Sequence, residues 1–255
     1  MECHSKKFDG KAGTYQAFRP DYAAQSIPFI VNTCGWEPGF QIADIGAGTG
    51  IFTRQLLDAG LKVAAVEPGK DMRAVLQEEL GDRDGLTIWN APAECTGLPD
   101  HSQDGITAAQ AFHWFDPDAF LLECRRILKP GGRLVLLWNM REASHPLTVQ
   151  AAQICQSYCP NFKGFSSESG WQTEQVEKIL GSRFIFKSFS HPISMDKERF
   201  VGRYLSSSYA PRPGDAAYAP FRKEMESLFQ SHEQEGRLSF PNRTCCYIGQ
   251  PMFAY

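Results

Sequence analysis

Between residues 41 and 139 the chain alternates short apolar runs with longer amphipathic stretches. The apolar runs predict strands that are buried on both faces: "QIADI", "LKVAAVE", "LTIW", "GITAAQ" and "RLVLLWN". Apolar residues recur at helical spacing in the stretches between them: "IFTRQLLDAG", "KDMRAVLQEEL" and "PDAFLLECRRILKPGG". Gly60, Gly81 and Pro130 with Gly131 are expected to end these helices. Strand alternating with helix predicts βαβ units, and therefore a doubly wound α/β fold.

The pattern changes after residue 145. Residues 146–159 and 172–181 are predicted to be helical, and "FIFKSFS" (184–190) and "TCCYIG" (244–249) are predicted strands. These two strands are expected to pair antiparallel at the edge of the sheet. A polar, helix-prone insert at 191–235 separates them and is expected to form a helical cap over the substrate.

One domain is predicted over residues 1–255, with a core at 35–145 and an N-terminal cap at 1–34. The net charge of −3 gives no basic field for nucleic acid. No apolar run approaches the ~20 residues that a membrane span needs. The first residues, "MECHSKKFDG", lack the apolar core of a secretion signal, so a cytoplasmic protein is expected. The eight cysteines are scattered and predict reduced thiols rather than a metal site.

The glycine-rich segment "ADIGAGTG" (43–50) joins the first predicted strand to the first helix. Its spacing fits neither a dinucleotide fingerprint, because Ile51 follows Gly50, nor a P-loop, because no lysine follows. Asp44 is poorly suited to hold phosphate and suits a ligand with an ammonium group. Glu67 ends the second strand and can accept hydrogen bonds from ribose hydroxyls. A ligand with a ribose and an ammonium group but no phosphate is S-adenosylmethionine.

On these residues the chain resembles class I S-adenosylmethionine-dependent methyltransferases of the small-molecule type. It is similar to the trans-aconitate and ubiquinone/menaquinone-biosynthesis methyltransferases. The matching segments are "FDGKAGTYQAFRPDY", "IADIGAGTGIFTRQLL", "VAAVEPGKDM", "AECTGLPDHSQDGITAAQAFHWFD" and "RRILKPGGRLVLLWN". The resemblance implies a Rossmann-like methyltransferase fold: α/β, with a mostly parallel seven-stranded sheet, an antiparallel edge strand and a helical cap. It fades after residue 145.

The resemblance also implies which residues bind the cofactor. These are Tyr15, Arg19, Asp44, Gly46, Ala47, Gly48, Gly50, Glu67, Pro68, Met72, Ala93, Glu94 and Gln110. Asp44 would orient the ammonium group, and Pro68 with Met72 would border the adenine. The family often has an acid where this chain has Pro92, so a side-chain bond to the adenine amine depends on Glu94.

The stretch "AFHWFD" (111–116) follows the fourth predicted strand. Phe112, His113 and Trp114 are expected to line the methyl-transfer cavity, because a cationic methyl group benefits from aromatic faces and low water content. The alternative is that two of its four rings pack under the next helix. Asp116 before Pro117 predicts a helix N-cap. Trp138 and Asn139 are expected at the same rim as substrate contacts, together with Phe112.

His113 and Trp114 are the candidate catalytic residues. An alcohol, phenol or carbon acid would need a base, for which His113 is the candidate; a wall role for His113 is the alternative. A carboxylate would need no base, and no ligand set for a metal is seen.

The predicted function is S-adenosylmethionine-dependent transfer of a methyl group to a small organic acceptor, preferably a carboxylate, without metal or nucleic acid. The alternatives are a lipophilic quinone or isoprenoid-type acceptor, and a non-catalytic S-adenosylmethionine-binding regulator. The insert also holds Arg203, Tyr204, Tyr209 and Arg212, which suit a carboxylate but equally suit a surface. The sequence leaves the acceptor atom and the oligomeric state open.

Overall fold

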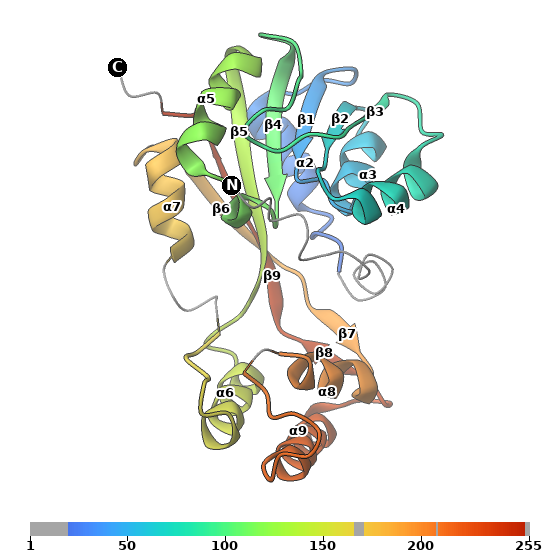
Figure 1. Cartoon of the computed structure of the whole chain (residues 1–255), viewed down its shortest axis with the longest axis vertical. Helices are drawn as coiled ribbons and strands as arrows, with labels where there is room; N and C mark the ends of the chain where they lie inside the picture. Colours follow the sequence, from blue (N-terminus) through green and yellow to red (C-terminus); the bar gives the residue numbers. More distant parts are fainter. Residues whose placement is uncertain (1–19, 166–170, 208, 253–255) are drawn as a thin grey trace. The chain divides into compact units, whose positions relative to one another are not determined.

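The computed structural model describes residues 20–165, 171–207 and 209–252 (Figure 1). These residues form two compact units. The described parts of Met1–Asn139, Thr173–Phe189 and Thr244–Tyr255 form unit 1, and those of Met140–Gln172 and Ser190–Arg243 form unit 2. The insert predicted at 191–235 is therefore part of a larger unit, which also takes in residues that follow the fifth strand.

Unit 1 is built around a seven-stranded sheet in the order β3-β2-β1-β4-β5-β9-β6. Its strands are β1 (Gln41–Ile45), β2 (Lys62–Val66), β3 (Leu86–Trp89), β4 (Gln103–Ala109), β5 (Leu128–Arg141), β6 (Ile185–Ser190) and β9 (Asn242–Gly249). Its helices are α2 (Ser26–Cys34), α3 (Ile51–Asp58), α4 (Lys70–Leu80), the 3-10 turn η2 (Phe112–Trp114), α5 (Pro117–Ile127) and most of α7 (Trp171–Leu180).

The predicted mostly parallel α/β sheet with an antiparallel strand is confirmed. β1 pairs in parallel with both β2 and β4. β2 and β3 extend the sheet on one side of β1, and β4 and β5 extend it on the other, so the strand order reverses between β1 and β4. β5 runs from unit 1 into unit 2, while its neighbour β9 returns from unit 2, so β9 runs against β5. In such a sheet ligands bind beyond the carboxyl ends of the strands at the reversal point, here β1 and β4.

One hydrophobic cluster joins two helices of unit 1 to its strands. It includes Ile30 of α2, Leu56 of α3, Ile42 of β1, Val135 of β5 and Ile248 of β9, and none of these is more than 1% exposed. The near-continuous apolar strands found in the sequence are explained by this burial on both faces.

The prediction that the helix over "PDAFLLECRRILKPGG" ends at Pro130 and Gly131 was wrong. α5 ends at Ile127, and Leu128 is extended with ψ 136°. Leu128 pairs with Gln103 of β4, and pairing resumes between Gly105 and Arg133. A residue that precedes proline is biased away from helical geometry, so the helix ends before "KPGG" and the segment becomes an irregular start of β5.

The described part of unit 2 holds three helices, α6 (Pro146–Tyr158), α8 (Lys197–Leu205) and α9 (Tyr218–His232), and a two-stranded sheet. Its strands β7 (Ile193–Met195) and β8 (Leu238–Phe240) pair antiparallel. Sequence reasoning missed these strands because three residues are too few for a periodic pattern. Across the described residues, no helix combines the length and apolar character needed to cross a membrane.

Candidate cofactor and substrate site

The three glycines of the loop after β1 have different surroundings. Gly46, Gly48 and Gly50 all have positive φ, at +71°, +59° and +85°, which glycine adopts without strain. A Cβ at Gly46 would lie 2.5 Å from Ala111 Cβ, and a Cβ at Gly50 would lie 2.8 Å from a Leu80 methyl carbon. A Cβ at Gly48 would meet nothing within 4 Å. Gly48 therefore offers an open backbone face, whereas the other two permit close packing.

Glu67 follows β2 and is bound to this loop. Its carboxylate accepts hydrogen bonds from the Gly48 N–H at 2.9 Å and the Gly69 N–H at 2.7 Å. Burial raises the pKa of Glu67, and these two N–H bonds oppose the rise. The carboxylate thus couples the glycine loop to the turn between β2 and α4.

Asp44 on β1 is 1% exposed, and both of its carboxylate oxygens accept hydrogen bonds. The hydroxyl of Thr53 on α3 donates at 2.7 Å, and that of Thr107 on β4 donates at 2.8 Å. Burial raises the pKa of Asp44 from 3.8 to about 6, although both hydroxyl bonds oppose it. Sequence reasoning missed the two threonines, because their partner is distant in the chain and a threonine in an apolar run is an ordinary strand residue.

Gln110, directly after β4, has φ +53° although it is not glycine. Its N–H donates to the carbonyl of Leu137 at 2.8 Å, and its Nε2 donates to the carbonyl of Asn139 at 3.1 Å. Left-handed backbone at a non-glycine residue is costly and often marks a functional position. Nothing in the sequence signalled this conformation.

The aromatic segment divides between core and surface. Phe112 is 1% exposed, and its ring lies 5.9 Å from Phe120 of α5 and 6.4 Å from Trp138 of β5. Phe115 is half-buried and lies 4.9 Å from Phe120. His113 is exposed, and Trp114 is 38% exposed. Two of the four rings thus pack under the next helix, and Phe112 lies in the core rather than on an open wall.

Asp116 is the N-cap of α5, as predicted, with Pro117 at the first helical position. Its carboxylate accepts hydrogen bonds from the N–H groups of Asp118 and Ala119, at 3.1 and 3.0 Å. The N–H of Asp116 itself donates to Glu94 at 2.8 Å. Glu94 was predicted to contact adenine; here it joins the loop after β3 to the aromatic segment.

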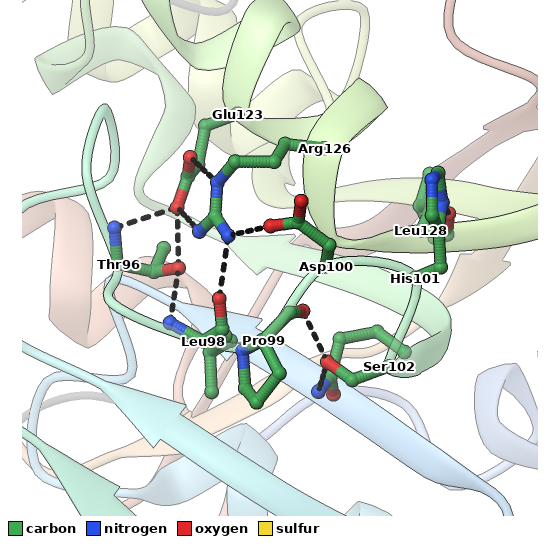
Figure 2. Close-up of polar contacts among 10 residues, drawn as sticks. Thr96, Leu98, Pro99, Asp100, His101, Ser102, Glu123, Arg126 and Leu128 are labelled. Carbon is green, nitrogen blue, oxygen red and sulfur yellow. Dashed lines mark hydrogen bonds and ion pairs between the residues drawn. The ribbon is translucent and has the colours of Figure 1, made fainter.

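Figure 2 shows a polar network that anchors the rest of that loop to α5. Glu123 is 7% exposed and accepts hydrogen bonds from the N–H and hydroxyl of Thr96, at 2.7 and 2.5 Å. Arg126 donates to both oxygens of Glu123, at 2.9 and 2.7 Å. Arg126 also donates to the carbonyl of Leu98 at 2.7 Å and to Asp100 at 2.6 Å. Burial raises the pKa of Glu123, but these bonds outweigh burial and the net shift is downward.

The side chain of Asn139 has a structural role here. Its amide donates to the carbonyl of Asp21 at 2.8 Å and accepts from the hydroxyl of Thr244 at 2.6 Å. Trp138 is buried in the core at 3% exposure. Tyr22 is also buried and packs edge-on against Phe52. Trp138 and Asn139, which were predicted to contact substrate, therefore make contacts within the protein.

The remaining predicted cofactor residues surround the same strand ends. Met72 and Ala93 are buried, at 4% and 5% exposure, and Ala47 and Pro68 are half-buried. Tyr15 and Arg19 lie outside the described residues.

Comparison with known proteins shows which family the core of unit 1 resembles. A family model described as "Methyltransferase domain" matches residues 43–136. An uncharacterized methyltransferase of Mycobacterium tuberculosis is 38% identical over 138 residues, which are 54% of each protein. Residues 43–136 form a methyltransferase domain of the class I S-adenosylmethionine-dependent type. The demethylmenaquinone methyltransferase of Renibacterium salmoninarum is 33% identical over 120 residues, 46% of this chain and 47% of that protein.

The similarity to this methyltransferase family is concentrated in the core. The chain spans about half the length of the curated relatives it matches first. A candidate type II methyltransferase from Anaeromyxobacter dehalogenans shares the fold, with TM-score 0.63 and 23% identity, covering 91% of this chain and 96% of that one.

The residues at the carboxyl ends of β1 and β2 suit S-adenosylmethionine as a ligand. Gly48 has an open backbone face, and the buried hydroxyl of Thr49 has no partner among the described residues. Asp44 is a desolvated carboxylate that a nearby ammonium group would favour. Glu67 is a half-buried carboxylate that can accept further hydrogen bonds.

Proposed function

We propose that this protein transfers a methyl group from S-adenosylmethionine to a small carboxylic acid and forms a methyl ester. When bound, the cofactor supplies an electrophilic methyl group on a sulfonium. Glu67 would hold the ribose, and the open face of Gly48 would admit the methionine portion. Asp44 would favour the ammonium group through its charge.

The exposure of His113 is the observation that supports a carboxylate acceptor. A base that removes a proton from an alcohol, phenol or carbon acid works best in a shielded site with a tuned pKa. His113 is exposed and its ring lies against the exposed Trp114, at 4.8 Å between centroids. A carboxylate is ionised at neutral pH and needs only alignment with the methyl group.

The test is a methyl-transfer assay with labelled S-adenosylmethionine and a panel of carboxylic acids, their amides and phenols. We expect label in esters that mild base hydrolyses. With S-adenosylmethionine saturating, so that its ammonium group keeps Asp44 ionised, His113→Gln should change kcat/KM for the acid as little as His232→Gln in unit 2. Under the same conditions kcat/KM for the acid should be flat from pH 6 to 8. A loss of ~10²–10⁴ for His113→Gln alone, with a pKa near 6–7 in the wild-type profile, would instead establish a base.

A quinone-type acceptor is the second candidate. It is supported by the similarity to the demethylmenaquinone methyltransferase over the core. The same assay with a reduced quinone in detergent micelles tests it, because a methylated quinone ring resists mild base. A protein that binds S-adenosylhomocysteine but labels no member of either panel would instead support the non-catalytic alternative.

A further inference from the structure

Arg141 is the last residue of β5, two positions after Asn139, and it lies in the aromatic core of unit 2. Its guanidinium carbon is 4.1 Å from the ring centroid of Phe165 and 5.6 Å from that of Phe240. Its Nη1 is buried without a hydrogen-bond partner in the described part of the chain. No carboxylate among those residues forms an ion pair with it.

A second buried donor lies beside it. The Tyr204 ring centroid is 5.4 Å from the Arg141 guanidinium carbon, and Tyr204 is 0% exposed. Its hydroxyl has no hydrogen-bond partner among the described residues. Burial raises the pKa of Tyr204 to about 12, although Arg141 and Arg203 oppose the rise, so the hydroxyl keeps its proton at neutral pH. The Tyr209 hydroxyl also interacts with Arg141 by a side-chain hydrogen bond.

The described residues do not supply acceptors for Nη1 of Arg141 and the hydroxyl of Tyr204. Buried donors nearly always have acceptors, and a buried unpaired donor is destabilising. Ring faces compensate part of the guanidinium charge but accept no N–H bond from Nη1. A planar anion would satisfy both groups, because the guanidinium fork matches a carboxylate and the phenol can donate to the same oxygen atoms.

We propose that Arg141 and Tyr204 form a site in unit 2 that binds the carboxylate of a small organic acid. The faces of Phe165 and Phe240 favour a flat, unsaturated or aromatic acid over a compact inorganic anion.

Binding can be measured without cofactor or turnover. Benzoate is the probe, benzamide is its neutral counterpart, and inorganic phosphate is a competing anion of the same sign. We expect calorimetry on the full chain to detect saturable benzoate binding at millimolar concentrations, weaker phosphate binding and no benzamide binding. No benzoate binding, or tighter binding of phosphate than of benzoate, would overturn the carboxylate site.

Two variants assign the binding to these residues. Arg141→Gln should weaken benzoate binding by about 10-fold or more, since it removes a charged donor. Tyr204→Phe should weaken it about 3- to 10-fold without lowering the melting temperature of the free protein, because it removes a hydroxyl that has no partner there. Arg222→Gln, on the exposed face of α9, is the charge-matched control and should bind benzoate normally. Benzoate affinity that is equal in all four proteins would leave Arg141 as a stacked structural residue and refute the site.

Discussion

At the scale of single residues, the buried carboxylate of Asp44 and the half-buried carboxylate of Glu67 dominate the candidate cofactor site. Asp44 lies on β1, and Glu67 directly follows the neighbouring strand β2. Burial raises the pKa of each carboxyl, although each carboxylate accepts two hydrogen bonds. Burial of a carboxylate costs stability near neutral pH where hydrogen bonds and nearby charges, such as that of Arg73 near Glu67, do not fully compensate it. The site is therefore destabilised in the free protein and is suited to a cationic ligand.

Asp44→Asn should remove a pH dependence of stability. The folded pKa of about 6 exceeds the ordinary value of 3.8, so this group's contribution is complete below pH 4 and is lost as pH rises through 6. The shift corresponds to about 3 kcal/mol in the free energy of unfolding. Denaturant unfolding at pH 4.5 and 7.5 should show that the variant gains relative to wild type at the higher pH. Equal differences at both pH values would show that Asp44 is not desolvated as described.

Glu67→Gln should weaken binding of S-adenosylhomocysteine by about 1.5–3 kcal/mol, because it removes a charged acceptor from the ribose and from the Gly48 N–H. Calorimetry measures the change. Glu78→Gln, at an exposed position of α4, is the matched control and should bind normally. Unchanged affinity in both variants would remove Glu67 from the ribose site.

Phe112 and Trp114 are neighbours in sequence but should respond oppositely to truncation. Phe112→Ala should cost about 3–5 kcal/mol of stability, because the ring is fully buried. Trp114→Ala should cost much less, since the ring is 38% exposed, and should lower kcat/KM if that ring borders the acceptor. Urea denaturation and the methyl-transfer assay separate the two effects. Severe destabilisation with normal turnover for Trp114→Ala would assign Trp114 to the core.

At the scale of elements, the network of Thr96, Glu123 and Arg126 connects the loop after β3 to α5. That loop also carries Glu94, which bonds to the start of the same helix. The loop is thus attached to α5 at both ends of the helix, by side chains rather than by strand pairing. Its position near the cofactor residues depends on these polar bonds.

Glu123→Gln should lower the free energy of unfolding by about 1–3 kcal/mol, because one amide cannot replace a buried carboxylate that accepts from both Thr96 and Arg126. Glu79→Gln is the control. It breaks an exposed ion pair with Arg54, at 44% and 40% side-chain exposure, and should cost under about 1 kcal/mol. Chemical denaturation of both variants makes the comparison. Equal costs would mean that the network is worth no more than a surface ion pair.

At the scale of the whole molecule, the protein should act without a metal ion. No group of three or more His, Cys, Asp or Glu residues in the described ranges is arranged to hold one. We expect methyl transfer to survive prolonged chelation and dialysis. A loss that magnesium or zinc alone restores would reveal a site formed with residues outside those ranges.

Much of unit 1 was predictable from the sequence for local reasons. β1, β3 and α4 have the predicted bounds, because apolar periodicity reports burial directly. The left-handed glycines and the Asp116 cap were equally readable, since each depends on the residue and its immediate neighbours.

Only the tertiary structure decided which side chains face the core, the surface or each other. The sequence shows four consecutive rings, but packing on Phe120 buries Phe112 and leaves His113 and Trp114 exposed. It shows an asparagine at a strand end, but Asp21 and Thr244 determine what Asn139 binds. Arg141 meets Tyr204 from a distant helix in the same way. Backbone conformation is set by neighbours along the chain, whereas these contacts join residues far apart in sequence, so no local pattern records them.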